Sequence, residues 1–213
     1  MELTAAGFAL FMHIFFVIAG LSLAAVLHTG LLLQRAAADV AAIRSWPRVI
    51  AVVEAALPIF AMLVLLTGAW LLHLSNGEFA WSQGWVAASL VGLVAAEAAG
   101  AAVGPRSAAL RRAINTAADG PLDAELRRRI RDPALWCVPN AITATFLAVV
   151  FVMVVKPSGL WSAVLIAVIA LLGALSGIPF SRPVRTGRRA SAAGHVAGHR
   201  DVGGGHPWTR TRS

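Results

Sequence analysis

Cysteine and lysine are almost missing from this chain of 213 residues, and charged residues of any kind are scarce. The single cysteine, Cys137, excludes an intrachain disulfide and a metal site built from several cysteines. Charged residues make up 13% of the chain and hydrophobic residues 58%, whereas soluble domains average roughly 25% and 45–50%. The composition therefore argues against a soluble globular domain.

The sequence signatures of soluble enzymes are also missing. The chain contains no phosphate-binding glycine loop, no zinc-protease helix and no nucleophile elbow with its partner residues. The sequence therefore does not predict an enzyme, and it does not support a nucleotide-driven pump that acts on its own.

Five apolar runs dominate what is present. They cover residues 6–33, 50–74, 85–103, 135–155 and 160–180, and about 20 apolar residues are enough to cross a bilayer. The runs show no two-residue alternation, which favours helices over barrel strands, because backbone groups in lipid must pair within the protein. We predict an all-α integral membrane bundle of five transmembrane helices in residues 1–180.

The basic residues predict the orientation of this bundle. Of the 18 Lys and Arg residues, all 17 arginines lie after the first run, after the third run or after the fifth, and only Lys156 lies elsewhere. Basic residues concentrate on the cytoplasmic side of membrane proteins. The sequence therefore predicts an outside N-terminus and a cytoplasmic C-terminus, and the bias toward arginine indicates a bacterial inner membrane.

Residues 181–213 are rich in Arg, Gly, Ser, Ala and His, and they predict a basic, disordered cytoplasmic tail. With a net charge of +8, the arginines suit the anionic lipids of the cytoplasmic leaflet better than a nucleic acid. His195, His199 and His206 have a spacing that could ligate a metal on a helix, but the glycines around them favour a tail without a metal site.

The connection from Pro105 to Pro133 shows helical periodicity on both sides of a turn at residues 119–121. Its apolar positions are Leu110, Ile114, Ala117, Leu122, Leu126 and Ile130. This pattern is typical of a basic amphipathic hairpin on the membrane surface, and a solvated connector is the alternative.

Polar residues inside the apolar runs are the candidate functional residues, because they are costly in lipid and by default face the bundle interior. We predict that His28, Glu54, Glu97 and Asn140 lie at one depth, near the cytoplasmic ends of their helices. The stripe Gly92, Ala96, Gly100 and Gly104 predicts a close helix contact beside Glu97. The cluster could be a proton relay, a cation site or a purely structural hydrogen-bonded group.

His13 raises the alternative of a membrane haem, because a histidine on a helix is a common axial ligand. A second axial histidine should lie on a facing helix at the same depth, yet His73 is about 10 Å nearer the outer surface. His28 lies on the same helix as His13, 15 residues and roughly 22 Å away. We therefore predict no cofactor, with haem at His13 as the alternative.

Several motifs resemble a domain-of-unknown-function family of small bacterial integral membrane proteins. They are FMHIFFVIAGL with His13, ALPIFAMLVLLTGAWLL with Pro58, Trp85, and VMVVKP with Lys156, and the resemblance covers residues 8–157. It implies a four-helix unit followed by one extra helix, and no established activity. More distantly, the first helices are similar to copper-resistance D-type domains and to haem-bearing protoporphyrinogen oxidases, whose third-helix lysine has no counterpart here.

Taken together, these features predict a bacterial inner-membrane protein that acts as a subunit of a membrane complex or as a small-solute permease. Its expected partners are further copies of the same chain or another membrane protein. The alternative is a membrane redox or haem/metal-binding protein that uses His13.

Overall fold

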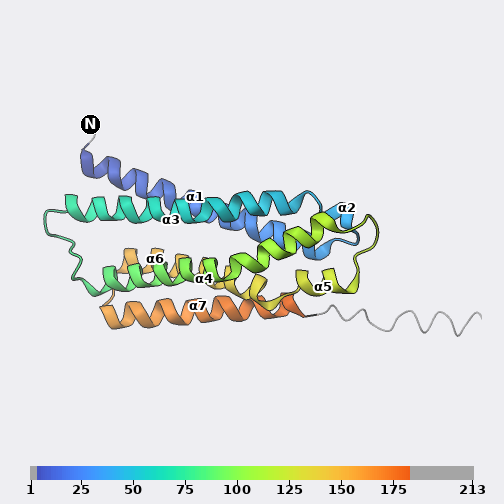
Figure 1. Cartoon of the computed structure of the whole chain (residues 1–213). Helices are drawn as coiled ribbons and strands as arrows, with labels where there is room; N and C mark the ends of the chain where they lie inside the picture. The colour runs from blue at the N-terminus through green and yellow to red at the C-terminus, as the bar shows by residue number, and fades with distance from the viewer. Residues whose placement is uncertain (1–3, 183–213) are drawn as a thin grey trace, which may run out of the picture. The chain divides into compact units, whose positions relative to one another are not determined.

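The computed structural model describes residues 4–182. This range is helical and contains no β-strand, only one isolated bridge between Asp39 and Pro121. Five segments are long and apolar enough to cross a membrane, which confirms the predicted all-α bundle. The predicted tail, with His195, His199 and His206, lies outside the described residues. The helices (Figure 1) are α1 (Ala5–Ala36), α2 (Val40–Ile43), α3 (Trp46–Leu74), α4 (Gly84–Thr116), α5 (Ala124–Ile130), α6 (Pro133–Val155) and α7 (Gly159–Ser181).

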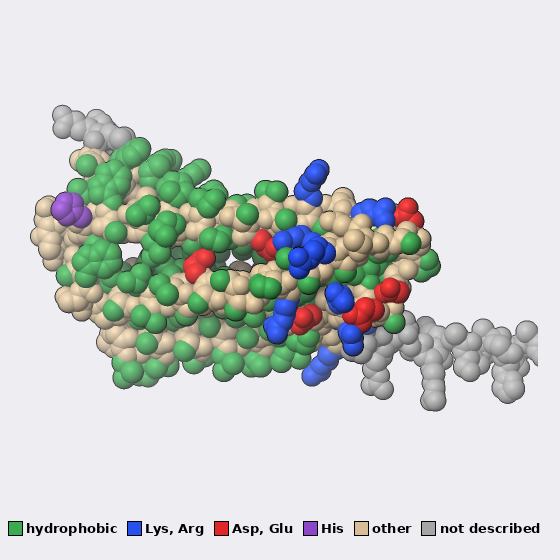
Figure 2. Space-filling model, viewed as in Figure 1, with side chains coloured by type: hydrophobic (Ala, Val, Ile, Leu, Met, Phe, Trp, Pro, Cys, Tyr) green, Lys and Arg blue, Asp and Glu red, His purple; other side chains and the backbone are tan. Residues whose placement is uncertain are grey.

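Aspartates begin three of these helices, as expected of a residue whose side chain satisfies free N–H groups in the first turn. Asp39 accepts from the Ala42 N–H at 2.8 Å, Asp123 from Leu126 at 2.6 Å and Asp132 from Ala134 at 2.9 Å. All three lie in the connections at one end of the bundle, which also holds α2, α5 and the arginines of these connections. We call this end the basic end, and Figure 2 shows its blue side chains.

The long helices pack as two groups. Helix α1 packs along α3, whereas α6 packs along α7 and α4 packs on both of them. Contacts between α3 and α4, and between α1 and α6, are far fewer. Figure 1 shows α1 and α3 side by side, apart from α4, α6 and α7.

Glycines allow the close approach of α7 to its neighbours, as small residues do in membrane helices. A Cβ atom on Gly177 would lie 2.7 Å from the backbone of Cys137, and one on Gly92 would lie 3.1 Å from the Ile166 side chain. A Cβ on Gly104 would meet nothing within 4 Å. The stripe on α4 is thus a packing face at Gly92, but it is open at Gly104.

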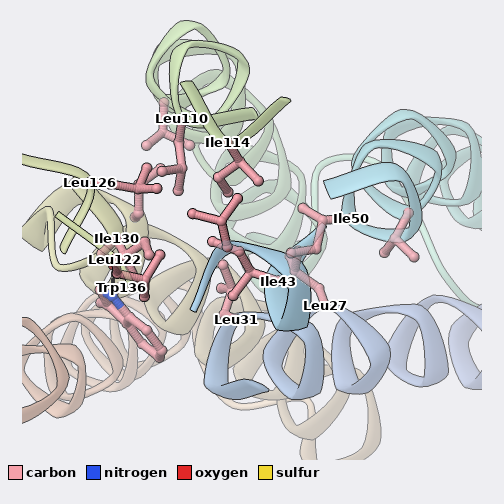
Figure 3. Close-up of a cluster of buried hydrophobic side chains, with 14 residues drawn as sticks. Leu27, Leu31, Ile43, Ile50, Leu110, Ile114, Leu122, Leu126, Ile130 and Trp136 are labelled. Atoms are coloured by element: carbon pink, nitrogen blue, oxygen red, sulfur yellow. Dashed lines mark hydrogen bonds between the residues drawn. The ribbon is translucent and has the colours of Figure 1, made fainter. Parts of the chain in front are cut away.

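A buried hydrophobic cluster joins the two groups at the basic end (Figure 3). Ile43 of α2 and Ile114 of α4 are completely buried in it. Leu126 and Ile130 of α5 pack in the same cluster, so the apolar side of the predicted hairpin contacts protein. The helical periodicity of the hairpin is confirmed, and its apolar positions are buried against other helices. That the hairpin lies on the membrane surface stays a prediction.

Candidate functional site

A cleft of about 740 Å³ lies between the two groups of helices. Helices α1 and α3 form one wall, and α4 and α6 form the other. Figure 2 shows openings among the hydrophobic side chains on the face of the molecule in view. Most lining residues are apolar or small, among them Gly20, Phe60, Gly104 and Phe146. The small side chains of α1 and α4 therefore leave room here that larger residues would fill.

Two carboxylates, Glu54 of α3 and Glu97 of α4, line this cleft from opposite walls. Both lie within the apolar stretches of their helices and are only partly buried. The sequence predicted that both face the bundle interior, and the cleft is where they do so. They differ in their hydrogen-bonding partners.

Glu54 is held by two side chains of α4. Its Oε1 accepts from the Ser107 hydroxyl at 2.5 Å, and its Oε2 pairs with the Arg111 guanidinium at 2.5 Å. Arg111 also donates to the Ser107 hydroxyl oxygen at 3.2 Å. This three-residue group connects α3 to α4, where the two helices otherwise have few contacts. Glu54 also lines the cleft, whereas Ser107 and Arg111 lie outside its lining.

Glu97 has no such partners. Within residues 4–182, no hydrogen bond or ion pair to its carboxylate is found. A carboxylate in an apolar membrane cavity is expensive unless something compensates its charge. Glu97 is therefore the carboxylate of the cleft whose charge no side chain among residues 4–182 compensates.

His28 and Asn140 form a second polar group. The His28 Nε2 atom lies 2.7 Å from the Asn140 amide oxygen, and Nδ1 lies 2.7 Å from the Ala24 carbonyl oxygen. The Asn140 amide nitrogen donates to the Ser176 hydroxyl at 3.1 Å. A neutral imidazole has one N–H, so it donates to only one of these two oxygens. This group links α1, α6 and α7.

The four predicted cluster residues thus separate into the His28–Asn140 group, the Glu54 group and Glu97 alone. That the four act together stays a prediction. Ser107, Arg111 and Ser176 were missed as partners. Ser107 and Arg111 lie one helical turn apart on the continuation of α4, which the sequence assigned to a separate surface hairpin.

A second cavity lies beyond the Glu54 group. This basic groove has a volume of about 790 Å³ and lies between the start of α3 and the end of α4. Four arginines line it, and one of them is Arg111. Because Glu54 lines the cleft and Arg111 lines the groove, their ion pair stands between the two cavities.

His13 is buried against α3, outside the cleft lining. Its Nδ1 atom lies 3.1 Å from the Val64 carbonyl oxygen and 3.0 Å from the Thr67 hydroxyl oxygen. Thr67 donates its own proton to the Leu63 carbonyl at 2.7 Å, so both neighbours of Nδ1 are acceptors. The Nδ1 atom therefore carries the proton, and Nε2 keeps a lone pair. Within residues 4–182, no group of three or more His, Cys, Asp and Glu residues could hold a metal ion.

The sequence was compared with protein families, curated proteins and solved structures. Residues 8–157 match the model of the family described as "Predicted integral membrane protein (DUF2269)". No curated protein and no solved structure matches significantly. The matched range begins in α1 and ends just after α6, so it includes both walls of the cleft and excludes α7. The chain belongs to the DUF2269 family of predicted integral membrane proteins.

Proposed function

We propose that this protein is a small-solute permease of the bacterial inner membrane and that the cleft between the two helix groups is its solute site. The observation that carries the proposal is the Glu97 carboxylate, which faces an apolar cavity without a partner among residues 4–182. A positive group on a bound solute would offset the cost of this carboxylate in lipid. The favoured solute is therefore small, largely apolar and cationic.

The arrangement of the helices supports transport. Alternating access requires two groups of helices that can move against each other around a site near the middle of the membrane. Here α1 and α3 form one group and α4, α6 and α7 the other, with few contacts along the cleft. The Glu54–Arg111 ion pair joins a residue that lines the cleft to one that lines the basic groove. Opening this pair would connect the two cavities, so we assign it the role of a gate.

The orientation is part of the same proposal. The positive-inside rule assigns the basic end to the cytoplasm, so the basic groove is the cytoplasmic mouth and the N-terminus is outside. An alkaline phosphatase fused after Asn76, in the connection between α3 and α4, should then be active. A fusion that is inactive there, together with a C-terminal reporter that lies outside, would contradict this orientation.

The proposed site can be tested with tetraphenylphosphonium, a small apolar cation, as the probe. Glu97→Gln keeps the size of the side chain and removes its charge, so we expect the probe to bind about tenfold more weakly to the variant, the equivalent of ~1.4 kcal/mol. Glu125→Gln is the matched control, because Glu125 lies on α5 and pairs with Arg128 and Arg129. Isothermal titration calorimetry of the purified protein in nanodiscs measures both affinities.

The pH dependence gives the same experiment a second readout. Protons and the probe compete for the Glu97 carboxylate, so lowering the pH should weaken binding to the unsubstituted protein. Glu97→Gln should lose the part of this dependence that Glu97 contributes. Equal affinities in the unsubstituted protein and Glu97→Gln would contradict the proposal, provided that both variants melt at the same temperature.

A membrane haem or metal protein that uses His13 is the second candidate. It is favoured by the contacts of Nδ1 with Val64 and Thr67, since metal-binding histidines are commonly held by a hydrogen bond from the other ring nitrogen. A visible spectrum of the purified protein tests for haem. A Soret band that disappears in His13→Ala supports haem, and a colourless protein rejects it.

A further inference from the structure

We propose that the basic groove binds the phosphate group of an anionic phospholipid, with Arg48 and Arg112 as its ligands. The groove lies between the first turns of α3 and the part of α4 that extends past Pro105. Arg44, Arg48, Arg111 and Arg112 line it, and Ala51 and Ala108 keep it open. Nothing in this inference depends on transport through the cleft.

Two of the four arginines are already neutralised within the protein. Arg44 pairs with Asp119 at 2.8 Å and donates to the Ala117 carbonyl at 2.8 Å, and Arg111 pairs with Glu54. Among residues 4–182, no carboxylate forms an ion pair with Arg48 or Arg112, and both are exposed. Two positive charges therefore face the groove without compensation.

These two guanidinium groups match a phosphate ester. Arginine presents several N–H donors in a plane and commonly contacts phosphate oxygens with two of them. The start of α3 adds its partial positive charge, and its first residue is preceded by Ser45, which makes no capping hydrogen bond. Arg48 from α3 and Arg112 from α4 could thus bind one phosphate from two sides of the groove.

The position of the groove favours a lipid over a soluble phosphate. Immediately after Arg48, the side chains of Val49 and Val52 are 39% and 65% exposed on α3, as expected of a lipid-facing surface. The groove therefore lies where the charged end of α3 meets its apolar stretch. A phospholipid satisfies both parts, because its phosphate reaches the arginines while an acyl chain covers the valines.

The test compares lipid binding of the full-length protein in detergent by native mass spectrometry. The probes are dioleoyl phosphatidylglycerol, dioleoyl phosphatidylcholine and inorganic phosphate. We expect phosphatidylglycerol to be retained in preference to phosphatidylcholine, and the double variant Arg48→Gln/Arg112→Gln to reduce its retention at least about tenfold. Arg106→Gln is the matched control, because Arg106 is an exposed arginine of α4 outside the groove.

Each outcome decides the proposal. Loss in the double variant alone supports a lipid phosphate site, and partial recovery in Arg48→Lys/Arg112→Lys shows that the charge is recognised. Retention of inorganic phosphate that displaces the lipid supports the same phosphate site with a soluble source. An equal loss in Arg106→Gln, or no loss in the double variant, overturns the proposal, because the arginines then act only as a diffuse charge. Thermal melting of every variant shows that the fold is intact.

Discussion

At the scale of single residues, the sequence located the costly side chains but not their partners. Glu54 and Glu97 could be recognised because an acid stands out within an apolar run. Their different surroundings could not, because Ser107 and Arg111 are more than 50 residues from Glu54 along the chain. Which carboxylate is paired depends on how α3 and α4 pack, and no local pattern records that packing.

Glycines show the same limit. The small-residue stripe that ends at Gly104 predicted a close helix contact there. In the structure, a Cβ on Gly177 would lie 2.7 Å from the backbone of α6, whereas the same atom on Gly104 would enter open space beside the cleft. Small residues in membrane helices therefore mark either a tight contact or a cavity, and only the fold distinguishes them.

This difference predicts opposite effects of the same substitution. Gly177→Ala should destabilise the bundle by about 1–3 kcal/mol, because α7 must move away from the Cys137 backbone to make room for the methyl group. Gly104→Ala should be neutral or stabilising by up to ~1 kcal/mol, since alanine favours the helix and meets no atom. Thermal melting in one detergent measures both. A larger loss of stability in Gly104→Ala than in Gly177→Ala would contradict the packing of α6 and α7.

At the scale of helices, hydropathy predicted the existence of each long helix and most of their ends within a few residues. It failed at α4, which was predicted to end near Val103 and continues through Pro105 to Thr116. Proline disfavours a helical conformation in the residue before it, and arginines follow Pro105. The sequence pattern therefore predicts that the helix ends before Pro105. The helix continues because Leu110 and Ile114 are buried in the cluster at the basic end. Burial of these residues depends on α2 and α5, which are too short to be read from apolar runs.

The extension of α4 has a functional consequence. It carries Ser107 and Arg111 to Glu54, and it forms one side of the basic groove. Both candidate sites at the basic end therefore exist because α4 does not stop at the proline. A chain that ended this helix at Gly104 would have neither the proposed gate nor the proposed phosphate site.

At the scale of the whole molecule, the described bundle combines tight packing within each helix group with loose packing between them. The hydrophobic cluster at the basic end and the Glu54 group hold the two groups together. Between the two helix groups, the cleft is large enough to hold a small molecule. Hydropathy predicted that there are five spans, but the division into two groups arises from contacts between distant helices.

If this cleft admits a solute, the reactivity of single cysteines should show it most directly. In a Cys137→Ser background, Ala101→Cys places a thiol on the cleft lining, and Ile59→Cys places one on a surface of α3 that is 60% exposed and outside the lining. A charged, water-soluble methanethiosulfonate should label Ala101→Cys, and tetraphenylphosphonium should slow that labelling. Ile59→Cys should stay unlabelled, because lipid covers it and a thiol in lipid does not ionise. If Ala101→Cys is as unreactive as Ile59→Cys, or if the probe leaves its labelling unchanged, the cleft is not a solute site.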